Sequence, residues 1–184
     1  MSAIRPATND TLEAIGNTPL VRLNKIVPAD SADVYVKMEM FNPTGSYKDR
    51  MARAMIEEAE KRGDLRPGMT VVEYTGGSTG SSLALVCSVK GYRFQVVCSD
   101  AFAQEKLRTM EALGADLTIE PSVGGEITPE LWQRIIAHAE RLAAQPGTYF
   151  TDQFNNQDAD KGLSLIHISE PTRPILVSRM PSSA

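Results

Sequence analysis

The chain has 184 residues, of which 42% are hydrophobic and 23% are charged, a balance typical of a globular protein with its own core. A formal net charge of −4 gives no overall basic surface for nucleic acid. No apolar run is long enough to cross a bilayer, and the N-terminus lacks the apolar segment of a secretory signal. We therefore expect a cytoplasmic protein with neither a nucleic-acid nor a membrane partner.

The first third of the chain predicts two short strands and a helix. Residues 15–23 contain a turn followed by a short apolar strand. Residues 33–39 alternate apolar and polar side chains, which predicts a half-buried strand. Residues 47–62 carry apolar side chains at helical spacing, and Gly63 is a typical residue for the end of that helix.

The rest of the chain predicts strands that alternate with helices. The expected strands are 69–74, 93–99 and 116–120, and the expected helices are 81–91, 104–114 and 128–147. In the last helix Thr128 is the expected N-cap, with Pro129 at the first helical position. Alternation of this kind from residue 34 to about 150 predicts an α/β fold with a three-layer parallel sheet.

The loop Thr75–Gly80 is the first candidate site. It joins an apolar strand to a helix, where glycines let backbone N–H groups turn toward a ligand and the helix dipole favours an anion. Ligands of parallel sheets bind in such loops, beyond the carboxyl ends of the strands. The loop is not a Walker A motif, because no lysine follows Gly80, and its glycine spacing is not GxGxxG. A tight strand-to-helix turn with Ser and Thr caps is the alternative.

Lys48 is the second candidate, in a stretch that reads FNPTGSYKDR. It lies at the predicted start of a helix, where the positive end of the dipole disfavours a protonated amine. The neutral amine is the form that reacts with an aldehyde. The alternative is a solvated surface lysine, and Asp49 suits the helix start for structural reasons alone.

The cysteines and histidines predict no metal or redox site. Cys87 and Cys98 do not form a CxxC or another metal-ligand spacing, so we expect two reduced, buried thiols. His138 falls in a helical pattern and His167 in an irregular tail. Two cysteines and two histidines at these separations do not indicate a zinc site or a Ser-His-Asp triad.

Four motifs together resemble a known family. GNTPLVRL, NPTGSYKDR, VVEYTGGSTG and QFNN occur in the order and at the approximate spacing of fold-type II pyridoxal-phosphate enzymes. The sequence is most similar to cysteine synthases and cystathionine β-synthases, over about residues 12–162. The resemblance implies the tryptophan synthase β-like fold, of which this chain is mainly the smaller, N-terminal domain.

The resemblance also implies roles for individual residues. Lys48 would hold pyridoxal 5'-phosphate covalently and would act as the base on the substrate Cα proton. Gln153 would reach the substrate α-carboxylate, and Ser78 would stand at the position that contacts the ring hydroxyl of the cofactor. The backbone of the loop would bind the same α-carboxylate through Thr75, Gly76, Gly77 and Thr79.

Two positions depart from the family pattern. Ser78 stands where the family usually has asparagine, and its shorter side chain needs a water to make the same contact. Gly76 stands where the family usually has serine, so a hydroxyl beside the substrate is lost. We expect a divergent branch with an altered preference for its amino acid or its nucleophile.

The implied reaction is β-replacement on O-activated serine, with O-acetylserine and sulfide giving cysteine and a homodimer expected for the full-length enzyme. Two alternatives stay open. One is a threonine dehydratase or threonine synthase-type lyase, because the lysine motif is shared across the superfamily. The other is a non-catalytic fragment that binds an anion.

The domain prediction has four parts. Residues 1–33 are expected to pack on a large second domain, 34–150 to form the α/β domain, and 151–162 to cross to the second domain. Residues 163–184 resemble a translated sequencing-adapter read-through, so we expect a non-native or disordered tail; a genuine divergent tail is the alternative. Family members carry their phosphate-binding glycine loop beyond this point, so we expect weak cofactor binding.

Overall fold

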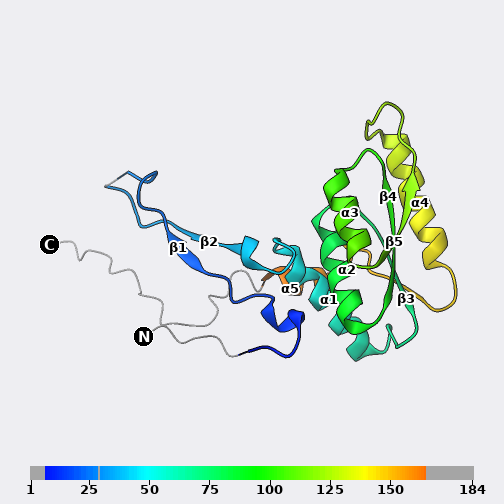
Figure 1. Ribbon diagram of the computed structural model, residues 1–184, viewed down its shortest axis with the longest axis horizontal. Helices are drawn as coiled ribbons and strands as arrows, with labels where there is room; N and C mark the ends of the chain where they lie inside the picture. Colours follow the sequence, from blue (N-terminus) through cyan, green and yellow to red (C-terminus); the bar gives the residue numbers. More distant parts are fainter. Residues whose placement is uncertain (1–6, 29, 165–184) are drawn as a thin grey trace.

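The computed structural model describes residues 7–28 and 30–164 and contains two sheets (Figure 1). The smaller sheet is an antiparallel pair of β1 (Leu20–Arg22) and β2 (Tyr35–Lys37). The larger sheet has four strands in the order β5-β4-β3-β6. The remaining elements are η1 (Thr11–Ala14), η2 (Glu39–Phe41), α1 (Lys48–Arg62), β3 (Thr70–Tyr74), α2 (Ser78–Lys90), β4 (Arg93–Ser99), α3 (Gln104–Ala112), β5 (Ala115–Glu120), α4 (Pro129–Ala143), β6 (Thr148–Phe150) and α5 (Gln157–Ser164).

The four-stranded sheet is parallel throughout, which confirms the predicted α/β fold. Thr70 of β3 lies opposite Arg93 of β4 on one side and Thr148 of β6 on the other. Helices α2 and α3 cover one face and α4 covers the other, which gives three layers, and α1 packs on the outside of α2 (Figure 1). The loops that follow β3 and β4 therefore leave the sheet at the same edge.

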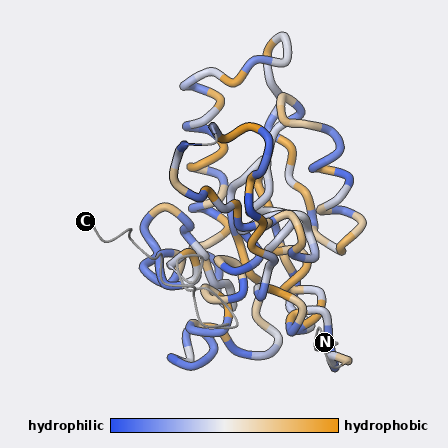
Figure 2. The backbone as a smooth tube through the Cα atoms, turned by 90° about the vertical axis from the view of Figure 1, so that its left-hand side faces the viewer, coloured by the Kyte–Doolittle hydropathy of each residue, from blue (hydrophilic) through white to orange (hydrophobic). Residues whose placement is uncertain are grey.

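Each face of the sheet has its own hydrophobic core. Val71 and Val96 point toward a large cluster with side chains of α1, α2 and α3. Tyr74 and Val97 point the other way, toward Ile135 and the rest of the buried side of α4. Hydrophobic segments accordingly run through the middle of the body in Figure 2. Burial on both faces explains why these strands consist of nearly continuous apolar runs.

Four residues that were predicted to mark helix ends do so in the structure. The Thr128 side chain accepts a hydrogen bond from the Leu131 N–H, and Pro129 is the first residue of α4. Gly63 and Gly91 end α1 and α2 in the left-handed conformation, with φ of 78° in both, which a residue without a Cβ adopts at low cost.

Several details differ from the sequence-based prediction. Helix α4 ends at Ala143, four residues before the predicted end at 147. The strand near residues 33–39 is not half-buried, because β2 pairs only with β1, and Tyr35 is 49% exposed. Helix α2 begins at Ser78, three residues earlier than expected, because Gly80 and Ser81 already donate to the Gly77 carbonyl. Elements β6 and α5 were not predicted.

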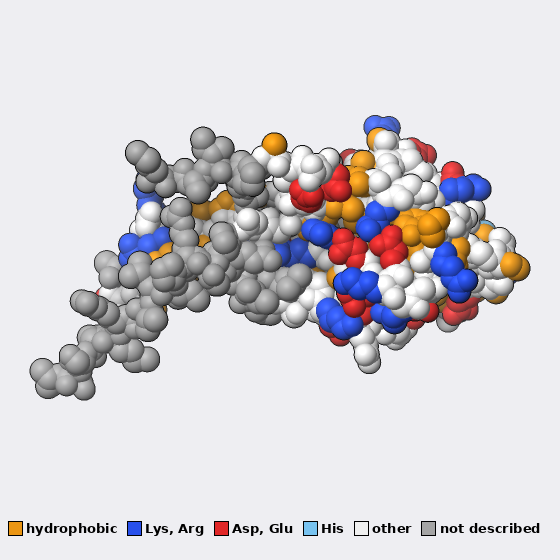
Figure 3. Space-filling view, turned by 90° about the horizontal axis from the view of Figure 1, so that it is seen from below, with side chains coloured by type: hydrophobic (Ala, Val, Ile, Leu, Met, Phe, Trp, Pro, Cys, Tyr) orange, Lys and Arg blue, Asp and Glu red, His pale blue; other side chains and the backbone are white. Residues whose placement is uncertain are grey.

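Ion pairs cover the outer surface of the helices. Two pairs link α1 to α5: Arg62 pairs with Asp158, and Glu58 pairs with Lys161. On the face shown in Figure 3, positive and negative side chains are interspersed. None of the helices formed by residues 7–28 and 30–164 has the length and apolar character needed to cross a membrane. Apart from Leu163 and Ser164, which end α5, the predicted tail lies outside the described residues.

Candidate functional site

The first candidate site is the turn from β3 into α2. Residues 75–77 form the turn, and the Gly77 N–H donates to the Thr75 hydroxyl oxygen over 3.3 Å. Across the part of the chain that the structure describes, the N–H groups of Gly76, Ser78 and Thr79 have no acceptor. Free N–H groups at the positive end of a thirteen-residue helix form a site for a small anion such as a carboxylate.

Gly76 makes room for an aromatic ring. A Cβ at this position would lie 2.1 Å from Cγ of Phe102, so no larger residue fits while the ring stays in place. Phe102 follows β4 and packs edge-on against Trp132, with ring centroids 6.2 Å apart. The Phe102 ring thus gives a physical reason for glycine at position 76, and Phe102 is a neighbour of the turn that sequence patterns did not reveal.

Gln153 joins the end of β6 to the same turn. Its side-chain oxygen accepts a hydrogen bond from the Thr79 hydroxyl over 2.7 Å, and its side-chain nitrogen donates to the Tyr74 carbonyl over 3.3 Å. The structure therefore brings Gln153 together with Thr79, across 74 positions of sequence. Ser78 lies beside them, half-buried, at the first position of α2.

Glu73 lies beneath this turn and was not singled out in the sequence. It is fully buried, and its carboxylate accepts hydrogen bonds from the Thr151 hydroxyl and from the N–H groups of Tyr74 and Gln153. Burial raises the pKa of Glu73 to about 7, and the charge of Asp152 adds to this, although the three hydrogen bonds act to lower it. An acidic residue inside a β-branched run could have indicated in the sequence that Glu73 has a role beyond packing.

Lys48 is the first residue of α1, as predicted. Its half-buried side chain packs within its own turn: Nζ lies 3.6 Å from Sδ of Met51 and 5.1 Å from the centroid of the Tyr47 ring. No carboxylate in the described ranges 7–28 and 30–164 forms an ion pair with this amine. Lys48 is therefore not committed to a structural salt bridge.

Asp49 connects the start of α1 to the first turns of α2. Its carboxylate accepts a hydrogen bond from the Ser82 hydroxyl over 2.6 Å, and others from the N–H and hydroxyl of Thr44. Asp49 and Ser82 are both completely buried. Two helix N-termini, one carrying Lys48 and the other the free N–H groups, are thus fixed side by side.

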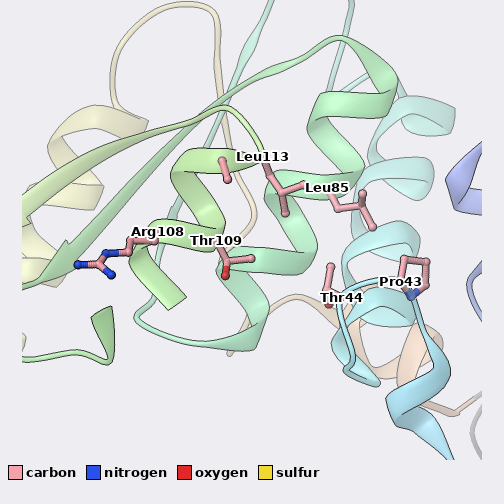
Figure 4. A pocket seen from close by; sticks show the side chains of 7 residues that line it. Pro43, Thr44, Leu85, Arg108, Thr109 and Leu113 are labelled. Carbon is pink, nitrogen blue, oxygen red and sulfur yellow. The ribbon is translucent and has the colours of Figure 1, made fainter. Parts of the chain in front are cut away.

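A shallow hollow of about 380 Å³ lies between the loop before α1 and the helices α2 and α3 (Figure 4). It is lined by Pro43, Thr44, Leu85, Arg108, Thr109, Ala112 and Leu113. None of the predicted site residues borders it, so the hollow is separate from the turn at Thr75–Gly77.

The two free cysteines, Cys87 and Cys98, are buried, as predicted. Burial raises the pKa of each thiol to about 12. A thiol of this kind stays protonated at neutral pH and is a poor nucleophile. The chemistry of the site therefore depends on the amine and on the N–H groups.

Comparison with known proteins decides the family. The model of a family described as pyridoxal-phosphate dependent enzymes matches residues 11–166. The chain belongs to the pyridoxal-phosphate dependent enzymes. Cysteine synthase of Staphylococcus aureus (strain N315) is 42% identical over 154 residues, which are 84% of this chain and 47% of that protein. A probable cysteine synthase of Bacillus subtilis (strain 168) is 43% identical over 148 residues, 80% of this chain and 46% of that protein.

The fold is likewise that of a solved member of this group of enzymes. The crystal structure of O-ureido-L-serine synthase superposes with a TM-score of 0.74 at 38% identity, over 85% of this chain and 48% of that chain. The chain thus spans about half the length of the curated relatives and solved structures that it matches.

The residues of this pyridoxal-phosphate dependent chain fit its family cofactor at Lys48. The Lys48 amine has no carboxylate partner among the described residues, so it is available to an aldehyde. The N–H groups at the start of α2 provide an anion site on the neighbouring helix, and Asp49 fixes the two helices together. The structure brings Gln153 together with the predicted residues of the turn, which are Thr75, Gly76, Gly77, Ser78 and Thr79. Lys48 is connected to this group indirectly, because the next residue, Asp49, bonds Ser82 of α2.

Proposed function

We propose that this chain forms the lysine-bearing and carboxylate-binding part of a cysteine synthase-like enzyme, which catalyses β-replacement on O-activated serine. The observation that carries the proposal is the junction of two helix N-termini through Asp49. One of these helices begins with an uncommitted lysine and the other with uncommitted N–H groups. The cysteine synthases among the relatives support the choice of reaction.

In this proposal the N–H groups of Gly76, Ser78 and Thr79 bind the α-carboxylate of the substrate. The Gln153 side-chain nitrogen uses one N–H group on the Tyr74 carbonyl and donates its second N–H to the same carboxylate. Binding at these fixed donors orients the Cα–H bond toward the Lys48 amine. Pyridoxal phosphate, when bound, supplies an electron sink for the negative charge left at Cα.

Lys48 then moves a proton between its amine and the substrate Cα. As Lys48 removes the proton from Cα, the Cβ–O bond breaks and acetate leaves with the bonding electrons. Sulfide adds to Cβ, and the proton returns from Lys48 to Cα, which gives cysteine. We also propose a cytoplasmic location and, for the complete enzyme, a homodimer whose substrate is a small amino acid.

The domain arrangement is part of the same proposal. Residues 34–150 hold the site together with Gln153, which lies in the crossover segment 151–162, while residues 1–33 supply a surface for a second domain. The exposed apolar side chains of the hairpin, Leu20 and Val21 among them, support this role. A threonine dehydratase or threonine synthase-type reaction finds no support among the cysteine synthase relatives.

Trapping of the cofactor tests the proposal. The 184-residue chain is incubated with excess pyridoxal phosphate, reduced with borohydride and mapped by mass spectrometry. We expect the label chiefly at Lys48, lost in Lys48→Ala and kept in Lys90→Ala, since the Lys90 amine already pairs with Glu60. A label spread evenly over the surface lysines would overturn the assignment of Lys48. Cysteine formation from O-acetyl-L-serine and sulfide, with none from threonine, tests the reaction class in the complete enzyme.

A further inference from the structure

Glu73 is a buried carboxylate without an ionic partner in the part of the chain that the structure describes. It lies on β3, one residue before the end of the strand, and its exposed surface is 0%. Taking a carboxylate out of water without a cation is costly, and an apolar residue would suit the core better. The position therefore calls for a reason beyond packing.

The hydrogen bonds of Glu73 supply that reason. One oxygen accepts from the Tyr74 N–H over 2.8 Å, within the same strand. The other accepts from the Thr151 hydroxyl over 2.7 Å and from the Gln153 N–H over 3.0 Å. Glu73 thus fixes the segment that follows β6 by two contacts, one of them on the backbone of Gln153.

The Gln153 side chain carries this connection to the candidate carboxylate site. Its oxygen accepts a hydrogen bond from the Thr79 hydroxyl, and Thr79 belongs to the first turn of α2, where the free N–H groups lie. The segment itself is a tight turn, in which the Asp152 carbonyl accepts from the N–H groups of Asn155 and Asn156. A path of short hydrogen bonds therefore leads from the core carboxylate of Glu73, through Gln153, to the anion site.

We propose that Glu73 is a positioning residue for the carboxylate-binding site, which it controls by holding the backbone of Gln153 in place. The inference rests on the proposed function, because it assumes that Thr79 and Gln153 face a substrate carboxylate. Glu73 itself touches neither substrate nor cofactor. Its role is to fix where the Gln153 amide stands before a ligand arrives.

The titratable groups around Glu73 are few. Asp152, after β6, and Tyr74, on the same strand, are the groups whose charge couples to it. Other charged residues on the neighbouring helices and strands form ion pairs with groups other than Glu73. Among them are Lys90 of α2 with Glu60, Arg93 of β4 with Asp116, Asp158 of α5 with Arg62 and Lys161, and Glu120 of β5 with His138 and Arg134. Glu140 of α4 acts on Tyr74 from the other face of the sheet.

The test uses the 184-residue chain, observed by NMR, with O-acetyl-L-serine as the probe. Two variants weaken the connection: Glu73→Gln removes the charge, and Thr151→Val removes one donor while the carboxylate stays. Two controls match them. Glu120→Gln changes a partly buried glutamate on β5, and Thr148→Val removes a hydroxyl of β6 that bonds the Ala143 and Gln145 carbonyls.

We expect the Gln153 backbone and side-chain amide signals to move as pH passes through about 7, and to lose this response in Glu73→Gln. We also expect both variants to bind the probe about tenfold more weakly, judged from the signals of residues 76–79, while both controls bind normally. Normal binding by Glu73→Gln or Thr151→Val would overturn the inference and leave the proposed function standing. Failure of the unmodified chain to bind the probe at 76–79 would overturn both.

Discussion

At the scale of single residues, two side chains next to the turn at Thr75–Gly77 shape the site without being part of the turn. Glu73 places an ionisable carboxyl group in the core, with hydrogen-bond donors as its only partners in the described ranges. Phe102 fills the space above Gly76. Each of these two side chains leads to a prediction that a substitution can test: the burial of the Glu73 carboxyl group and the close contact of Phe102 with Gly76.

The first prediction concerns stability against pH. Since the pKa of Glu73 is raised in the folded chain, from 4.5 to about 7, the folded state holds a proton that the unfolded state has released. The stabilising contribution is complete below pH 4.5 and is lost as pH rises through 7. We expect the free energy of unfolding to fall by about 3 kcal/mol over this range on account of Glu73.

Urea unfolding of the chain and of Glu73→Gln across this pH range measures the difference. The free energy of unfolding should fall less steeply with pH in Glu73→Gln, because the glutamine does not titrate. Parallel curves for the two proteins would show that Glu73 is ionised at the same pH in the folded and unfolded chains.

The second prediction concerns Gly76. Its substitution by alanine places a Cβ against the Phe102 ring, and we expect a loss of about 1–3 kcal/mol in the free energy of unfolding. In the double variant Gly76→Ala/Phe102→Ala the clash is absent, so the combined loss should be smaller than the sum of the single losses.

Gly77→Ala is the matched control for this cycle, because a Cβ at position 77 meets no atom within 4 Å. Chemical denaturation of the five proteins gives all the required values. Additive losses in the Gly76 and Phe102 variants would contradict the contact.

At the scale of elements, the functional geometry depends on how helices meet. Asp49, near the start of α1, binds Ser82 on α2 and both polar groups of Thr44 in the preceding loop. All three donors would lose the carboxylate if it were removed, and only the hydroxyls of Thr44 and Ser82, 3.3 Å apart, could still bond each other. A buried junction of this kind fixes the distance between the two helix N-termini.

The third prediction follows from this junction. Asp49→Ala should lower the free energy of unfolding by about 3 kcal/mol, because the buried Ser82 hydroxyl and the half-buried donors of Thr44 lose their carboxylate acceptor. Asp64→Ala provides the comparison, since this side chain is 52% exposed in its pair with Arg62 and should cost less than about 1 kcal/mol. Similar losses in urea unfolding of the two variants would mean that Asp49 does not join the helices.

The sequence predicted the elements with strong local signals and missed those held by distant contacts. Strand 93–99 and the Thr128 cap agree with the structure because a long apolar run and a cap with proline are local signals. Helix α5 has no such pattern. It packs on α1 at Gly162, where a Cβ would lie 2.7 Å from the Arg50 carbonyl oxygen, and a close approach of this kind depends on residues far away in the chain.

The candidate site divides in the same way. The motif around Lys48 and the loop at 75–80 were visible in the sequence, because glycines and a lysine at helix starts carry a physical signal. Glu73, Thr151 and Phe102 were not, because their roles depend on pairings across the sheet and between loops. Only the register of β3 with β4 and β6 brings these residues together.

At the scale of the whole molecule, the hairpin of β1 and β2 projects away from the α/β body (Figure 1). Glu39 holds its base, because its carboxylate accepts hydrogen bonds from Arg50 of α1 and from the Thr18 hydroxyl. Beyond this base the hairpin exposes apolar side chains beside the Arg22–Asp33 ion pair; Val21 and Val36, opposite each other in the register, are 44% and 39% exposed. Two strands alone do not bury an apolar face.

The fourth prediction concerns this exposed face. Because Val21 and Val36 lie side by side, we expect the chain to bind a hydrophobic dye such as ANS, and we expect the double variant Val21→Thr/Val36→Thr to bind markedly less of it. Val123→Thr is the matched control: its valine is 82% exposed but lies in the loop between β5 and α4, away from the hairpin. A drop in fluorescence with the control as large as with the double variant would show that the dye does not report on the hairpin. The same double variant should weaken docking of a second domain in the complete enzyme, because the apolar face that we assign to that contact is then polar on both strands.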